Sequence, residues 1–188
     1  MKVNRSLNFA RRKRRLFFIL AIGLQFCFLF ALMWPSFATI ARGDEIVVHA
    51  MPVDPWDLFR GDYITIEYGF SRIKSPGAGM LKGFKAGSPV FVVLSKSGDT
   101  WVMSRVMKEP CPLASGQIGL KGRVKYASDD EITVHYGLER VYIEEGRGRQ
   151  LSDNAGFEVK LVVDCGGHGV VKEVRHREDV LYSWRKFL

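Results

Sequence analysis

The chain is poor in the residues that most often build metal centres. Its 188 residues include three cysteines and four histidines, and the histidines fall at no recognised ligand spacing. The one close pairing, Cys165-x-x-His168, has no second pair of ligands in the sequence. A group of acidic residues could hold calcium, but helix capping accounts for two of its members without an ion. This group consists of Asp54, Asp57 and Asp62, with Arg60 among them. We therefore expect no metal and no cofactor.

Motifs for nucleophilic catalysis are also missing. The sequence has no Gly-x-Ser-x-Gly and no histidine placed beside a serine in a motif. Paired carboxylates remain as a catalytic option, because two of them about 5–9.5 Å apart can carry out acid–base chemistry on a sugar polymer. The candidates are Asp62 with Glu67, Glu144 or Glu145. An envelope hydrolase stays open as an alternative, although we expect a protein that is not an enzyme.

Acidic residues are absent from the first 42 positions, whereas eight basic residues lie there: Lys2, Arg5, Arg11, Arg12, Lys13, Arg14, Arg15 and Arg42. The whole chain has 28 basic and 20 acidic residues, so residues 43–188 carry 20 of each and no net charge. A nucleic-acid-binding domain needs a basic face on its folded part. The positive charge of this chain therefore reports membrane topology, and we expect no nucleic-acid partner.

Nineteen residues without a charge follow the basic cluster, from Leu16 to Trp34. At about 1.5 Å per helical residue they nearly match a hydrocarbon core of about 30 Å. Basic residues before such a segment hold the N-terminus in the cytoplasm. The competing interpretation is a signal peptide cleaved after Ala38 or Ala41. We expect a retained membrane anchor, with a cytoplasmic tail (1–15), a transmembrane helix (16–34), a linker (35–44) and a domain outside the cytoplasm (45–188).

The domain has the pattern of short β-strands throughout. Ile46, Val48 and Ala50 alternate with Val47 and His49, and apolar residues alternate with polar ones at Ile64–Tyr68. Val90–Leu94 is a continuous apolar run typical of a strand buried on both faces. Three hairpins are predicted, with turns near Gly98, Asp129 and Gly166. A last short strand is expected at 180–182. The fold class is mostly β, as an antiparallel β-sandwich or a partly open β-barrel.

Two segments are predicted to be loops: 70–88, which is rich in glycine, and 108–119. Cys111 lies in the second loop, and Cys165 lies in the turn of the third hairpin. The predicted topology places both thiols in an oxidising compartment, so they are candidates for a disulfide. Two unpaired thiols are the alternative, because the sequence does not show whether their Cα atoms approach within about 7 Å.

The segment from Val53 to Tyr68 is the most informative motif. Asp54, Pro55 and Gly61 predict a single capped helical turn. It leads into Gly-Asp-Tyr-Ile-Thr-Ile-Glu-Tyr (61–68), a strand whose odd and even residues face opposite sides. A later block, residues 136–149, begins Tyr136-Gly137-Leu138-Glu139-Arg140, continues through Val141 and Tyr142, and leads into a Glu-Gly-Arg-Gly turn (145–148). Together, in this order, the two blocks resemble the GDYXXLXY family of bacterial membrane-anchored proteins, with Ile66 at the leucine position.

The resemblance implies an anchor in a bacterial inner membrane, with a periplasmic or extracellular domain (45–188). It also implies a partner that is a multi-pass membrane protein, because relatives are often encoded beside such proteins. We expect a non-enzymatic domain that binds a membrane or envelope protein. A small-ligand module, with a pocket lined by Trp56, Tyr63 and Tyr68, is a further alternative. The candidate binding residues are Trp56, Arg60, Asp62, Tyr63, Tyr68 and Arg140.

Overall fold

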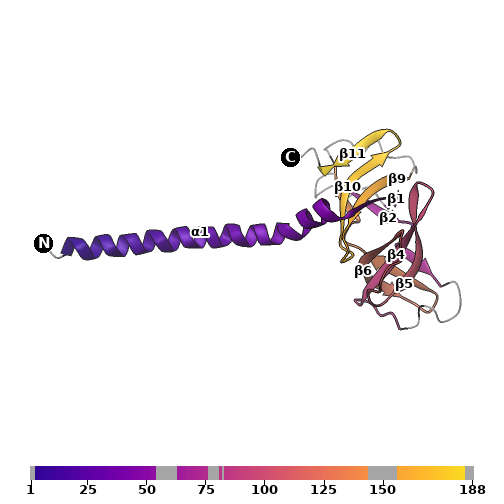
Figure 1. Cartoon of the computed structure of the whole chain (residues 1–188), viewed down its shortest axis with the longest axis horizontal. Coiled ribbons are helices and arrows are strands. Elements are labelled where there is room, and N and C mark those ends of the chain that lie inside the picture. The colour runs from indigo at the N-terminus through magenta and orange to yellow at the C-terminus, as the bar shows by residue number, and fades with distance from the viewer. Residues whose placement is uncertain (1–2, 54–62, 76–80, 82, 144–155, 185–188) are drawn as a thin grey trace. The chain divides into compact units, whose positions relative to one another are not determined.

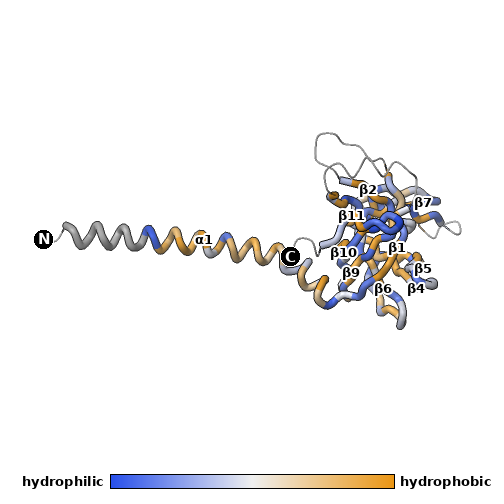
Figure 2. The backbone as a smooth tube through the Cα atoms, turned by 90° about the horizontal axis from the view of Figure 1, so that it is seen from above, coloured by the Kyte–Doolittle hydropathy of each residue, from blue (hydrophilic) through white to orange (hydrophobic). Residues whose placement is uncertain are grey.

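A computed structural model describes residues 3–53, 63–75, 81, 83–143 and 156–184, with side chains from Arg14 onward. The chain divides into two compact units, residues 1–38 and 39–188. Within the described residues there is one α-helix, α1, which spans Val3–Arg42. Its stretch Arg14–Arg42 is long and apolar enough to cross a membrane, and the apolar run along it is visible in Figure 2.

The helix is longer than the sequence analysis predicts. Residues 35–42 were expected to belong to a linker, but α1 continues through Pro35 and ends at Arg42. A proline inside a helix removes one backbone hydrogen bond. At the C-terminal end of α1 the helical hydrogen-bond pattern is intact, since the Gly43 N–H donates to the Thr39 carbonyl over 2.8 Å. The last helical turn, from Thr39, thus belongs to the β-rich unit.

Two antiparallel sheets make up this unit (Figure 1). One has six strands in the order β11-β10-β9-β1-β2-β8, and the other has five in the order β3-β7-β6-β4-β5. The strand bounds are β1 Asp44–Pro52, β2 Tyr63–Tyr68, β3 Arg72–Lys74, β4 Pro89–Ser97, β5 Thr100–Met107, β6 Gln117–Ala127, β7 Glu131–His135, β8 Arg140–Tyr142, β9 Phe157–Val163, β10 Gly169–His176 and β11 Asp179–Ser183.

Both sheets share one hydrophobic core. Alternate residues of β1 and β2 point into it, because side chains of successive strand residues lie on opposite faces. The strands of the second sheet contribute the facing side chains. Among the core residues are Ile46, Val48, Ile64, Ile66, Tyr68, Val90, Val92, Leu120, Ile132 and Leu161. The predicted fold class, a mostly β antiparallel arrangement, is confirmed.

Strand β4 is buried on both faces, as its apolar run predicts. Val92, Val93 and Leu94 are all fully buried, although three consecutive strand residues cannot share one face. The pairing with β5 shifts in register between Val93 and Leu94. Such a β-bulge reorients the side chains that follow it. The run is therefore accommodated by burial on two faces together with a bulge.

The three predicted hairpins and the last strand are present as β4–β5, β6–β7, β9–β10 and β11. Two of the observed strands were not predicted from the sequence, β3 and β8. β3 lies inside the segment predicted to be a loop, and β8 lies within the second sequence block. Each has three residues, too few for a recognisable alternation. Each is defined instead by its pairing with a longer strand. β3 pairs with β7, where Ile73 lies opposite Ile132, and β8 pairs with β2, where Val141 lies opposite Ile64.

Candidate functional site where the two sequence blocks meet

Pairing of β2 with β8 brings the two sequence blocks together in space. Tyr63 lies opposite Tyr142, and Thr65 lies opposite Arg140. The contact extends by one more bond, in which the Ile66 N–H donates to the Glu139 carbonyl over 2.8 Å. About 70 residues separate the blocks along the chain. Two segments that seem independent in the sequence therefore form one element of the fold.

The outward side of this pairing carries three side chains that we call the aromatic–arginine cluster: Tyr63, Tyr142 and Arg140. The two tyrosine rings lie 6.2 Å apart between centroids and are tilted by 56°. The Arg140 Cζ lies 5.8 Å from the centre of the Tyr63 ring, within the range of a cation–π contact. Tyr142 is 67% exposed, and Arg140 is also exposed. Two predicted binding residues, Tyr63 and Arg140, thus form one surface with Tyr142, which the sequence analysis did not select.

Tyr68 faces the opposite side of β2 and is only 1% exposed. Its ring stacks on Phe70 with 5.2 Å between centroids, and it meets Tyr136 edge-on at 6.3 Å. Its hydroxyl donates to the Leu138 carbonyl over 2.8 Å. Burial, with a smaller contribution from the nearby Glu139 carboxylate, raises the pKa of Tyr68. Tyr68 is therefore a core residue rather than a surface residue for a partner, and it cannot line one pocket together with Tyr63.

A polar groove of about 340 Å³ adjoins the cluster. Its deepest charged side chain is Glu139, which is 12% exposed. One oxygen, Oε1, accepts the Tyr136 N–H over 2.5 Å, and His135 Nε2 lies 3.2 Å from the other. Burial, and then the Glu139 charge, raises the pKa of Tyr136. The groove is lined by Val53, Thr65, Ile66, Glu67, Ser71, Arg72, Lys125, Glu131, Thr133, Val134, His135, Glu139 and Arg140.

Glu67, one of the carboxylates considered for catalysis, is engaged in an ion pair. Its two oxygens accept the Arg72 guanidinium at 2.5 Å and 3.1 Å. A carboxylate bound in this bidentate way is oriented by its partner rather than presented to a substrate. The other carboxylates proposed for the hydrolase, Asp62, Glu144 and Glu145, lie outside the described residues.

The remaining predicted binding residues, Trp56, Arg60 and Asp62, also lie outside the described part of the chain, together with the capped turn. Glu139 was not selected from the sequence, although it stands in the second block directly before a strand. Among the residues that the structure describes, no three histidine, cysteine or acidic side chains lie together as a metal site.

A family model for GDYXXLXY proteins matches residues 25–174, which is most of the chain and includes both blocks. The chain belongs to the GDYXXLXY family. Searches of curated proteins and of solved structures give no match. The GDYXXLXY match thus spans the C-terminal part of the apolar helix, the two blocks and most of the third hairpin, and it names no activity.

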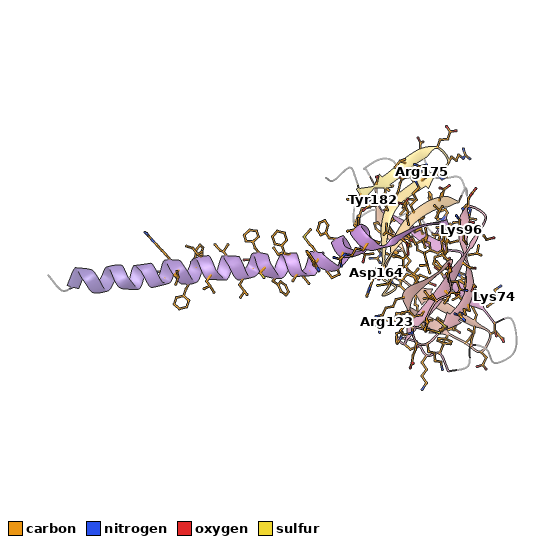
Figure 3. All side chains as sticks on the ribbon, in the orientation of Figure 1. Lys74, Lys96, Arg123, Asp164, Arg175 and Tyr182 are labelled. Carbon is orange, nitrogen blue, oxygen red and sulfur yellow. The ribbon has the colours of Figure 1, made fainter. Side chains whose placement is uncertain are left out.

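A second polar arrangement of this GDYXXLXY protein holds the end of α1 within the domain. The buried Thr39 hydroxyl donates to Asp164 Oδ2 over 2.7 Å, while Oδ1 accepts the N–H groups of Gly166 and His168 at 2.9 Å and 3.0 Å. Figure 3 labels Asp164 at the end of β9. Partial burial raises the pKa of Asp164, but these hydrogen bonds and the nearby His168 imidazole together lower it below its usual value. Asp164 is a structural residue that joins the β9–β10 loop to the last helical turn.

Proposed function

We propose that this protein is a non-enzymatic, membrane-anchored domain outside the cytoplasm that binds a membrane or envelope protein through the aromatic–arginine cluster. The observation that carries the proposal is the exposure of Tyr142 and Arg140 on a face that both sequence blocks build. Tyrosine and arginine are enriched at the centres of protein interfaces. The adjoining groove, lined by acidic and basic side chains, would supply the polar rim.

Anchoring in the inner membrane is supported by α1. Its apolar side chains between Leu16 and Trp34 are exposed, as expected for a helix whose surroundings are lipid. Cleavage after Ala41 would remove Thr39, a buried residue of the domain, so this form of the signal-peptide alternative is disfavoured. The partner would be a multi-pass membrane protein, with Gln25 of the anchor available for a hydrogen bond between helices.

The orientation can be tested with two reporter fusions. We expect alkaline phosphatase joined after Leu188 to be active and green fluorescent protein at the same position to be dark, because the basic residues before Leu16 hold the N-terminus inside. Fusions at Arg15, before the apolar segment, serve as the control and should give the reverse result. A mature protein that begins at Thr39 would show instead that the segment is removed.

The binding surface can be tested by substituting Tyr142. Tyr142→Ala should reduce recovery of the partner from solubilised membranes at least about tenfold, because truncation of a tyrosine at the centre of an interface costs about 2 kcal/mol or more. Its melting temperature should stay close to that of the original chain, since the side chain is mostly exposed. Recovery is measured by quantitative mass spectrometry of a tagged full-length chain.

Tyr126→Ala is the matched control. Tyr126 is 61% exposed and lies on β6, in the other sheet. This variant should recover the partner as well as the original chain does. Equal recovery by both variants would remove the aromatic–arginine cluster as the binding surface, whereas a Tyr142→Ala chain that fails to fold would show that the residue is structural.

A further inference from the structure

Two loops that are far apart in the sequence converge on Gly119 of β6. The β5–β6 loop brings the Leu113 side chain to 3.4 Å from the position that a Gly119 Cβ would take. The β9–β10 loop arrives from the other side, where the Gly167 carbonyl accepts the Lys121 N–H over 2.8 Å. The Cβ position of Gly167 lies 3.0 Å from the Gly119 carbonyl oxygen, so a side chain there would be crowded against the backbone. This close approach fixes one loop beside the other.

A cavity of about 370 Å³ lies between these loops, and both cysteines of the domain line it. Cys111 and Cys165 are two residues before Leu113 and Gly167 respectively, and both are exposed free thiols. Prolines flank Cys111 on both sides, which limits its backbone to extended conformations. Cys165 precedes two glycines, of which Gly167 has a φ of 81°. The backbone at Cys111 is thus restrained, whereas Cys165 lies in a turn with glycine on its C-terminal side.

We propose that Cys111 and Cys165 form an intramolecular disulfide across this cavity. A thiolate of one cysteine attacks a sulfur of an external disulfide and releases one thiol of that donor. The second cysteine then attacks the mixed disulfide, the Cys111–Cys165 bond forms, and the second donor thiol leaves. The donor is reduced, the protein loses two electrons and two protons, and no other reactant is needed. The oxidising surroundings follow from the proposed placement of the domain outside the cytoplasm.

The bond would connect the β5–β6 loop to the loop that holds the end of α1. Cys165 directly follows Asp164, whose carboxylate accepts the Thr39 hydroxyl over 2.7 Å. Formation of the disulfide would therefore stabilise the contact between the end of α1 and the β9–β10 loop, and it would narrow the cavity. The loop closed by the bond has about 54 residues, which corresponds to an increase in melting temperature of about 10 °C.

The test uses the full-length chain with Cys27→Ser, so that only the two loop thiols remain. After incubation of the purified protein with oxidised glutathione, a maleimide-polyethylene glycol reagent should add to neither thiol, and after reduction it should add to both. Tryptic digestion should then yield residues 109–121 linked to residues 161–172. Labelling of both thiols after oxidation, or linkage only between two chains, would overturn the proposal.

Variants separate this proposal from the proposed function. Cys111→Ser and Cys165→Ser should each yield no linked peptide, because the remaining thiol can form only a mixed disulfide with glutathione. The difference in melting temperature between oxidised and reduced protein should then disappear. Tyr142→Ala should still form the bond, because the reaction does not involve the aromatic–arginine cluster. If the original chain forms no disulfide but recovers its partner in a way that depends on Tyr142, only the disulfide proposal is contradicted. If the disulfide forms but Tyr142→Ala recovers the partner normally, only the proposed binding surface is contradicted.

Discussion

Tyr68→Ala is expected to lower the free energy of unfolding by about 3–5 kcal/mol, the range for removal of a large aromatic side chain from a core. The side chain is 1% exposed and lies against Phe70 and Tyr136. Its removal would leave a cavity between the two sheets. It would also leave the Leu138 carbonyl without the hydrogen bond that the Tyr68 hydroxyl donates. Urea unfolding of the full-length chain in detergent, followed by tryptophan fluorescence, gives the change.

Two controls accompany this substitution: the first separates packing from hydrogen bonding, and the second tests which face of β2 is buried. Tyr68→Phe keeps the ring and removes the hydroxyl, so it should cost about 1 kcal/mol. Tyr63→Ala removes a tyrosine from the outward face of the same strand and should cost less than Tyr68→Ala. If Tyr68→Ala and Tyr63→Ala lowered stability equally, the assignment of the two faces of β2 would be wrong.

Gly43→Ala should be the second strongly destabilising substitution, with a cost of about 1–3 kcal/mol or more. A Cβ at this position would lie 2.6 Å from the Thr39 carbonyl oxygen, 2.7 Å from Val162 Cγ1 and 2.8 Å from the Val163 carbonyl oxygen. Two of these atoms belong to the backbone, so relief requires that α1 and β9 separate. The buried Thr39 hydroxyl and its bond to Asp164 would be disturbed at the same time.

Gly69→Ala is the control for Gly43→Ala, because nothing lies within 4 Å of its Cβ position. This variant should melt close to the original chain. A Gly43→Ala chain with an unchanged melting temperature would mean that the last helical turn is not packed on the domain as described.

The sequence was sufficient to predict the parts of the fold that depend on local pattern. Alternation along Ile64, Ile66 and Tyr68 correctly gave the inward face of β2, and the turn residues near Gly98, Asp129 and Gly166 correctly gave the hairpins. Both follow from rules that act over a few residues, since side chains alternate across a strand and glycine or aspartate favours turns.

Features that depend on long-range contacts were missed. The strand β8 is defined by its pairing with β2, about 75 residues earlier, and nothing in Arg140–Tyr142 alone indicates a strand. Glu139 and Tyr142 belong to the candidate site only because this pairing places them beside Thr65 and Tyr63. The end of α1 at Arg42, beyond Pro35, was likewise missed, and the close approach of Gly43 to β9 at this end is a long-range contact that the local sequence does not show.

The first sequence block therefore serves two purposes on its two faces. The inward residues Ile64, Ile66 and Tyr68 complete the core, whereas the outward Tyr63 meets Tyr142 and Arg140 from the second block. The motif thus combines packing on one face with a partly exposed surface on the other. The proposed function depends on the outward face alone.

Photo-crosslinking from that face is the most direct test of the proposed function. The photoreactive residue p-benzoylphenylalanine would replace Tyr142 in one chain and Tyr126 in another, and both chains would be irradiated in native membranes. We predict that position 142 gives a covalent product with a multi-pass membrane protein and that position 126 does not. The same product from both positions, or none from position 142 in a folded, membrane-inserted chain, would contradict binding through the aromatic–arginine cluster.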